Sequence, residues 1–340
     1  MPYQKVYTKV SKGRKGDNSM AVLEKTERHT PPEVKRTRGK WLRLLTGDQL
    51  QMQTMIWPGL ILCFIFCYIP MYGIIIAFKD YNILSTVTGA DWVGLKYFRE
   101  FFNDPALSNV LRNTLILNGL ALVFSFPAPI LLALFINEIR NVRFKKTVQT
   151  ISYLPHFLSW VIFGGIVLEM LMPNGVISVT LYKLGVIPEP INFMAKGEYF
   201  YAIYTIISVI KSVGFGSILY VAAITGIDQE LYEAATVDGC GRFQKMWYIT
   251  LPCISGTIVI MLIFQISSIL NTGYEQIILL QNSLNLAFSE TLDTYVYKIG
   301  IAQSRYSYAA AVGLLKSILS VTLMLLANHT SKKALGRGLF

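Results

Sequence analysis

The sequence predicts an all-α protein that crosses a membrane several times. Its 340 residues are 53% hydrophobic and only 15% charged, with a mean hydropathy of +0.46, whereas soluble domains carry about 25% charged residues. Apolar runs of 20 or more residues recur along the chain, and helices of that length span a hydrocarbon core of about 30 Å. This composition excludes a secreted disulfide scaffold, a disordered hub and an ordinary cytosolic enzyme.

The N-terminal segment differs from the rest of the chain. Residues 1–40 are polar, rich in Lys and Arg and without periodic apolar positions, and no signal-peptide-like apolar stretch follows the N-terminus. We expect a disordered basic cytoplasmic tail that sets the orientation, although its basic residues also suit contact with anionic lipid. Residues 41–53, which begin with Trp41, are expected to form an interfacial helix.

Residues 54–340 are expected to form a six-helix transmembrane domain. The six apolar spans are predicted at 54–77, 110–136, 149–172, 199–225, 252–272 and 308–328. Breaks are expected in the first, second and fourth of these spans, at Pro58 and Pro70, at Pro127 and Pro129, and at Gly214 and Gly216. Broken backbone is not tolerated against lipid, so the breaks should face protein or a cavity.

The distribution of Lys and Arg predicts the orientation. The segments 34–53, 137–148, 226–251 and 329–340 together hold 14 basic residues, and the opposite loops hold seven. Basic residues favour the cytoplasmic side, so both termini are expected in the cytoplasm. The net charge of +11 is therefore interpreted as an orientation signal in a lipid bilayer, and nucleic acid is excluded as a partner.

The island at 227–252, between the fourth and fifth spans, carries the most informative polar residues. Asp228 is suited to cap a helix, and Gly239 and Gly241 allow a sharp reversal. Pro252 suits the first turn of the next membrane helix. An apolar stripe is predicted at Ile227, Leu231, Ala234 and Ala235. Together these features predict a helix–turn–helix projection on the cytoplasmic side, of the kind that passes force from a soluble partner into a membrane bundle.

This island resembles the signature loop of permeases in binding-protein-dependent ABC importers. The matching residues are Glu233, Ala234, Ala235, Asp238, Gly239, Ile249, Leu251 and Pro252. Residues 153–160, 92–95, 113–114 and 211–214 resemble the carbohydrate-uptake branch, in particular permeases for complex polysaccharide fragments related to maltose-type importers. The resemblance covers roughly residues 50–340 and departs from the family pattern at Cys240, where Ala is more usual.

The resemblance implies a type I ABC importer permease fold in a bacterial cell membrane. It implies a second permease chain, giving a heterodimer, with two ATPase subunits and an extracytoplasmic sugar-binding protein. The loop around Glu233 would then seat in the ATPase as the coupling site. The chain has no phosphate-binding loop, so it is expected to be non-catalytic and without a cofactor, with ATP and Mg bound by the partner ATPase.

The candidate residues for a substrate path lie inside the spans and in their outer half. Lys211 and Lys316 are intramembrane charges, which are costly and therefore functional candidates, with Glu169 as a possible ion-pair partner. Side chains suited to sugar are Tyr68, Tyr72, Asn118, Phe124 and Trp160. Structural pairing of the lysines, and an interfacial belt or core role for the aromatic residues, are the competing interpretations.

Two other classes of function are considered. An ion-coupled secondary transporter should show a repeat and buried carboxylates within its spans, and the sequence has no visible repeat and only Glu169 as a candidate. A membrane-embedded glycan-processing enzyme needs catalytic polar residues clustered at one membrane face. Neither a Ser–His–Asp set, nor zinc-ligand spacing, nor a catalytic carboxylate pair is evident, so the transport subunit is the preferred hypothesis.

Overall fold

The computed structural model describes residues 47–83, 86–336 and 338–339. The predicted tail at 1–40 and residues 41–46 of the predicted interfacial helix lie outside the described residues. The chain divides into two units, Met1–Phe64 and Ile65–Phe340, and each unit is described by itself.

The described residues are almost entirely helical. Six helical stretches are long and apolar enough to cross a membrane, as the sequence predicts. Their bounds are Thr54–Phe78, Leu107–Glu138, Trp160–Lys183, Gly197–Thr225, Arg242–Ser267 and Tyr306–Ala334. Within the described ranges, β pairing is limited to an isolated bridge between Lys79 and Trp92.

The first unit contains α1 (Gly47–Cys63). Residues 47–53 form the first turns of this helix, so the part of the predicted interfacial helix that is described continues directly into the first span. Pro58 lies within α1, and the side chains of Met55 and Trp57 are exposed. The backbone changes to a π-helical segment, η1 (Phe64–Tyr68), and then to a 3-10 helix, η2 (Ile69–Phe78). The predicted break at Pro58 is wrong, because α1 continues through this residue, and near Pro70 the helix changes type without ending.

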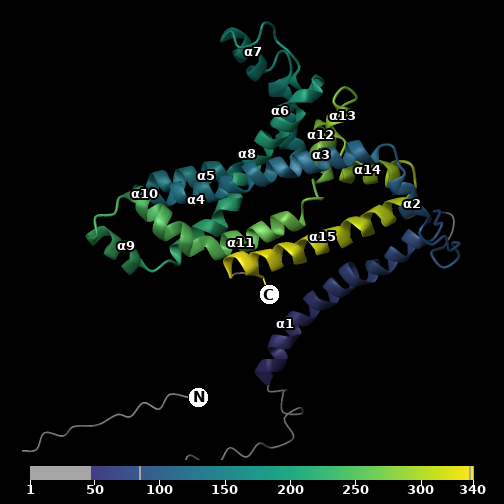
Figure 1. The fold of residues 1–340 in the computed structure, drawn as a ribbon, viewed down its shortest axis with the longest axis horizontal. Coiled ribbons are helices and arrows are strands. Elements are labelled where there is room, and N and C mark those ends of the chain that lie inside the picture. Colours follow the sequence, from purple (N-terminus) through teal and green to yellow (C-terminus); the bar gives the residue numbers. More distant parts are fainter. Residues whose placement is uncertain (1–46, 84–85, 337, 340) are drawn as a thin grey trace, which may run out of the picture. The chain divides into compact units, whose positions relative to one another are not determined.

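The second unit is a bundle of long helices with shorter helices at its ends (Figure 1). Helices α9 and α10 lie at one end of α4, α8 and α11, and α2 and α14 lie toward the opposite end. The segment α6–α7 projects from the bundle. The bounds are α2 (Lys96–Phe102), α3 (Leu107–Leu120), η3 (Ala121–Ser125), α4 (Pro127–Glu138), α5 (Val142–Phe157), α6 (Trp160–Leu171), α7 (Val176–Lys183), η4 (Phe193–Ala195), η5 (Gly197–Tyr199), α8 (Phe200–Thr225), α9 (Gln229–Val237), α10 (Arg242–Lys245), η6 (Met246–Thr250), α11 (Leu251–Ser267), α12 (Tyr274–Leu280), α13 (Leu286–Ser289), α14 (Leu292–Tyr297), η7 (Lys298–Ala302) and α15 (Tyr306–Leu335).

The third predicted span, 149–172, is not one continuous helix. Helix α5 ends at Phe157 and α6 begins at Trp160. Ser159 caps α6 by accepting a hydrogen bond of 3.2 Å from the backbone N–H of Ile162. Pro155 lies in the last turn of α5, and the span thus consists of two helices with a break between them.

The fourth predicted span is continuous where the sequence suggested a break. Helix α8 runs without interruption through Gly214 and Gly216. A Cβ atom on Gly214 would lie 1.9 Å from the carbonyl oxygen of Ser152, and one on Gly216 would lie 3.1 Å from Pro129. The glycines in α8 therefore allow close approach of α5 and α4 and do not interrupt the helix.

The helix of the fifth span begins earlier than predicted. Residues Arg242–Ser267 form one helical run through α10, η6 and α11. Pro252 lies near the start of α11, directly after the π-helical η6, in which the Leu251 N–H bonds to the carbonyl of Met246. A proline has no N–H to donate, and the helical run continues through Pro252 with a π-helical turn directly before it.

Polar contacts hold the helices together at the α2–α14 end. The carboxylate of Asp104 accepts hydrogen bonds from the hydroxyl groups of Tyr295 and of Tyr308, the latter at 2.9 Å, and from the Ala106 N–H at 2.9 Å. Burial of Asp104 opposes its ionisation, but these donors together hold the pKa of its carboxyl below its usual range. Asp104 thus joins the loop after α2 to α14 and α15.

Candidate functional site

Helix α9 is anchored on one face to the ends of the membrane helices. Asp228 caps it by accepting a hydrogen bond of 3.0 Å from the Glu230 N–H. Ile227 and Ala235 are buried, and the Tyr232 hydroxyl shares a hydrogen bond of 2.8 Å with the hydroxyl of Thr250 in η6. Burial raises the pKa of the Tyr232 hydroxyl, as expected for a neutral group that is packed between helices.

The turn after α9 is fixed by backbone geometry and by one lysine. Gly239 has φ +77°, a conformation that favours glycine, and the Cys240 N–H bonds to the Ala235 carbonyl at 2.9 Å. Lys245 donates a hydrogen bond of 2.6 Å to the hydroxyl of Thr236 across the turn. The projection formed by residues 227–252 is therefore joined firmly to the helical run that becomes α11.

The predicted coupling residues divide between an exposed face and a packed face. Glu233, Ala234, Asp238 and Gly239 are exposed, whereas Ala235 is buried. Leu231, predicted in the inward stripe with Ala234, is also exposed, because Tyr232 takes the inward position. Toward the membrane, Ile249 and Leu251 are half-buried and Pro252 is exposed.

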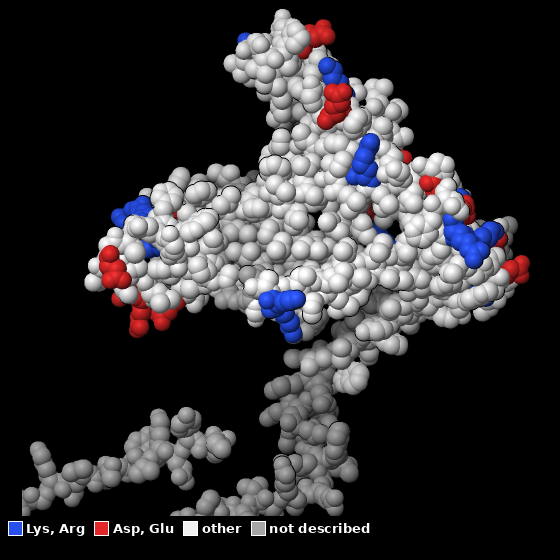
Figure 2. Space-filling view, in the orientation of Figure 1, with Lys and Arg blue, Asp and Glu red and all other residues white. Residues whose placement is uncertain are grey.

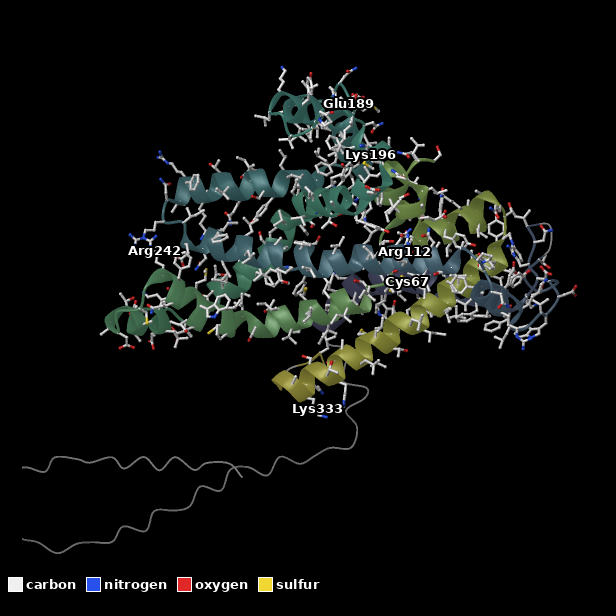
Figure 3. The ribbon with its side chains drawn as sticks, turned by 45° about the horizontal axis from the view of Figure 1, so that its top comes forward. Cys67, Arg112, Glu189, Lys196, Arg242 and Lys333 are labelled. Atoms are coloured by element: carbon white, nitrogen blue, oxygen red, sulfur yellow. The ribbon has the colours of Figure 1, made fainter. Side chains whose placement is uncertain are left out.

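The exposed face of the projection is acidic. Figure 2 shows carboxylates gathered at the end of the bundle where α9 lies, with basic side chains beside them. Exposed acidic residues on α9 and at its two ends are Asp228, Glu230, Glu233 and Asp238. Figure 3 places Arg242 at the same end, away from Glu189 and Lys196. An acidic helix with exposed Ala234 and Val237 is suited to a basic, closely fitting cleft on a partner.

A polar cavity of about 270 Å³ lies within the bundle. Its walls come from α3, η3, α6, α8, α11, the loop after α11 and α12. Its polar lining includes Asn118, Ser125, Trp160, Tyr204, Thr205, Ser208, Ser212, Gln265, Ser268, Asn271, Thr272 and Gln276. Hydroxyl and amide groups facing a common space can bind a ligand with many hydroxyl groups.

Of the seven predicted substrate-path residues, two line this cavity and five, including Lys211 and Lys316, do not. Asn118 and Trp160 belong to its wall. Phe124 instead lines an apolar groove of about 770 Å³ between η3, α4 and α8. Tyr68 and Tyr72 are exposed on η1 and η2 and do not line the cavity.

Lys211 is buried at the break between α5 and α6. Its ammonium group donates hydrogen bonds to the carbonyls of Pro155, at 3.0 Å, and of Leu158, and lies 3.5 Å from the His156 carbonyl. It also lies 5.0 Å from the ring centre of Trp160. Lys211 therefore satisfies carbonyls at the C-terminal end of α5 in the way a capping residue does, and it fixes the position of Trp160.

Lys316 is paired with a residue that the sequence did not single out. Its ammonium group bonds to the carboxylate of Asp293 in α14. The same carboxylate accepts hydrogen bonds from the Thr272 N–H, at 2.7 Å, and from the Thr272 hydroxyl. The proposed pairing of either lysine with Glu169 is wrong, because both ammonium groups are bound elsewhere.

Several residues of the cavity wall escaped the sequence analysis. Tyr204, Ser208 and Ser212 recur at intervals of four residues along α8, which places them on one face of the helix. This polar stripe inside an apolar span is the sequence signal that could have identified these three cavity residues. Gln265, Asn271 and Gln276 come from the end of α11 and from beyond it, and their convergence depends on the loop that follows α11.

Comparison with known proteins assigns the class. Residues 125–335 match the family described as binding-protein-dependent transport system inner membrane component, and the chain belongs to this family. Membership in this family supports the hypothesis of a transport subunit over those of an ion-coupled secondary transporter and of a glycan-processing enzyme. It agrees with the six membrane-crossing helices.

Individual relatives match nearly the whole chain. Protein LplB of Bacillus subtilis (strain 168) is 44% identical over 308 residues, which cover 89% of this chain and 96% of that protein. The polygalacturonan/rhamnogalacturonan transport system permease protein YteP of the same organism is 42% identical, over 90% of this chain and 95% of that protein. A solved bacterial alginate ABC transporter in complex with an alginate pentasaccharide-bound periplasmic protein has a chain with a TM-score of 0.79 and 38% identity, covering 88% of this chain and 99% of that chain.

Proposed function

We propose that this chain forms half of the translocation pore of an ATP-driven importer of oligosaccharides or polysaccharide fragments. The observation that carries the proposal is the acidic projection at 227–252, which is anchored to the helical run that becomes α11, in a bundle that contains a polar cavity. The polysaccharides in the names of two similar proteins, polygalacturonan/rhamnogalacturonan and alginate, support the substrate class.

The proposed partners are those that the family resemblance implies. A second permease chain, in a heterodimer, completes the pore, and two ATPase subunits bind ATP and Mg and dock on the projections of the two permeases. An extracytoplasmic sugar-binding protein delivers the substrate at the opposite face, and no nucleic acid takes part. The chain resides in a bacterial cell membrane with both termini in the cytoplasm. It contributes no catalytic group and holds no cofactor of its own.

The projection transmits movement from the ATPase to the pore. Glu233, Ala234, Asp238 and Gly239 present the docking face, while Ala235, Ile249, Leu251 and Pro252 connect that face to the bundle. The hydrogen bonds from Tyr232 and Lys245 across the projection limit its independent movement. Displacement of the docked face is therefore transmitted to α11 and α8, whose residues line the cavity.

The docking role is tested by reversing one charge. Glu233→Lys in the complete importer, reconstituted in vesicles, is expected to lower ATP-driven sugar uptake at least about tenfold, because like charges then meet at the ATPase surface. Gly239→Pro should have the same effect, because proline cannot adopt the φ of +77° found there.

Membrane insertion should be unchanged in both variants. The matched control is Glu189→Lys, an exposed acidic residue beyond α7, which should leave uptake near the wild-type rate. Normal uptake by Glu233→Lys and Gly239→Pro would exclude the coupling role of the projection.

A further inference from the structure

A basic pocket of about 470 Å³ lies where the projection meets the bundle. Its walls come from the end of α4 and the residues after it, from the end of α8, and from α9 and α10. The volume falls within the range of about 300–1,000 Å³ that is usual for ligand pockets. The charged lining residues are Arg140, Arg242, Lys245 and Glu138, so positive charge exceeds negative charge in the wall.

The cations of this basic pocket are not neutralised by the fold. Within the part of the chain that the structure describes, Arg140, Arg242 and Glu138 form no ion pair. The ammonium group of Lys245 donates to the neutral hydroxyl of Thr236, and it has three N–H donors in all. The carboxylates on α9 and at its two ends do not line the pocket. The pocket therefore presents cationic donors to a ligand, and an anion is the ligand that they suit.

The basic pocket lies at the ends of three membrane-crossing helical stretches. Leu107–Glu138 and Gly197–Thr225 end there, Arg242–Ser267 begins there, and the terminal residues Glu138, Thr225 and Arg242 all line the pocket. Trp247 and Tyr248, in the π-helical segment after α10, are exposed, and exposed Trp and Tyr side chains are typical of the headgroup level of a bilayer. The pocket is thus placed where the phosphate groups of lipids lie.

Apolar surface continues from the basic pocket along α4. Leu131, Phe135 and Glu138 follow one another at intervals of four and three residues, which places them on one face of the helix. Leu131 and Phe135 are exposed, and Leu131 also lines the apolar groove of about 770 Å³ between η3, α4 and α8. A ligand whose anionic group occupies the pocket therefore has apolar surface for hydrocarbon chains on the same face of the same helix.

We propose that the basic pocket binds the phosphate group of an anionic phospholipid, with Arg140 and Arg242 as donors and the acyl chains along α4. Arginine offers a fork of N–H donors that matches a phosphate, and basic pockets between membrane helices suit anionic headgroups. The bound lipid links the end of α4 to the helical run that begins at Arg242 and becomes α11. This inference goes beyond the proposed function, because lipid binding requires neither sugar nor ATP.

Native mass spectrometry of the complete importer in detergent tests the proposal, with phosphatidylglycerol and phosphatidylcholine as the added probes. The double variant Arg140→Gln/Arg242→Gln should bind one molecule of phosphatidylglycerol fewer at high affinity than the wild type. At this site its dissociation constant should rise at least about tenfold. Binding of phosphatidylcholine should be the same in both proteins, because its choline group balances the charge of its phosphate.

Two further double variants separate the basic pocket from surface charge and from folding. Arg143→Gln/Lys146→Gln removes two exposed basic residues at the start of α5 that do not line the pocket, and it should bind phosphatidylglycerol as the wild type does. Arg140→Lys/Arg242→Lys keeps both charges and should retain most of the high-affinity binding.

Inorganic phosphate, added in large excess, distinguishes a lipid headgroup from a free anion. It should leave the bound phosphatidylglycerol in place, because it gains nothing from the apolar surface of α4. Three results would overturn the proposal. They are equal phosphatidylglycerol binding by the wild type and Arg140→Gln/Arg242→Gln, an equal loss in Arg143→Gln/Lys146→Gln, and displacement of the lipid by inorganic phosphate, which would identify a site for a free anion.

Discussion

Asp104 shows how single residues secure the end of the bundle opposite the projection. Its carboxylate binds the hydroxyls of Tyr295 and Tyr308, and burial together with this contact raises the pKa of Tyr295 to about 12. The carboxyl of Asp104 has a pKa below its usual range in the folded protein. Ionised Asp104 therefore stabilises the fold, and the neutral form does not.

This arrangement predicts a stability that depends on pH. The unfolded carboxyl has a pKa of about 4, so the contribution of Asp104 should be complete above that value and decline as the pH falls toward the lower folded value. The measurement is the thermal unfolding of the purified importer between pH 7 and pH 3. Comparison with Asp104→Asn isolates the contribution, and the stability advantage of the wild type should shrink with acidification. An advantage that stays constant across this range would show that the titration of Asp104 is not coupled to folding.

The roles of single residues could be predicted where they depend on the local sequence alone. Asp228 was predicted to cap α9 and Gly239 to form the turn, and the structure has both features. Lys211 and Lys316 were recognised as costly charges, but their partners could not be predicted. Backbone carbonyls at a helix break carry no signature in side-chain sequence, and Asp293 lies on the short helix α14, whose position depends on packing.

At the scale of elements, the break between α5 and α6 depends on the neighbouring helix. Gly214 lets α8 approach the backbone of α5 at Ser152, and this contact brings Lys211 to the α5 carbonyls. Removal of the ammonium group leaves the half-buried carbonyls of Pro155 and Leu158 without their donor, which costs about 1–3 kcal/mol.

Lys211→Met is therefore expected to lower the free energy of unfolding by about 1–3 kcal/mol and to reduce sugar uptake, because Trp160 loses its support beside the cavity. The measurements are thermal unfolding and ATP-driven uptake in the complete importer. Lys183→Met, an exposed lysine at the end of α7, serves as the control and should change neither quantity. Equal behaviour of the two variants would contradict the capping role.

The existence of the helices followed from hydropathy, but the location of their breaks did not. Gly214 and Gly216 were interpreted as breaks, although a helix tolerates glycine when close packing compensates for it, as in α8. Pro155 marks the actual break in the third span. Whether a proline ends a helix depends on donors and π-helical turns nearby, as the different outcomes at Pro155 and Pro252 show.

At the scale of the molecule, the distribution of charge gives the bundle two distinct ends. On the face that Figure 2 shows, charged side chains gather at both ends of the bundle and on the projecting segment, and the surface between the two ends is largely uncharged apart from a basic group near the C-terminal end of α15. From the counts of Lys and Arg we predict that the α9–α10 end faces the cytoplasm and that the projecting segment beyond α6 faces the outside.

Two matched cysteine variants test this orientation. Val237→Cys on α9 and Val186→Cys after α7 replace exposed valines in a chain without its four native cysteines, which are free thiols in the structure. A membrane-impermeant maleimide should label Val237→Cys only in inside-out vesicles and Val186→Cys only in right-side-out vesicles. The reverse pattern would invert the topology and exclude docking of a cytoplasmic ATPase on α9.

The contact between Lys211 and the broken third span also constrains how the chain is assembled. The ammonium group of Lys211 donates a hydrogen bond to a carbonyl 53 residues earlier in the sequence. The ribosome therefore synthesises α5 and α6 well before Lys211, the residue that donates to the carbonyls between them. Until α8 is in place, the carbonyls at the end of α5 lack the ammonium donor that they have in the folded chain. We therefore expect the fourth span to fix the position of the break before α6 after both segments have been synthesised.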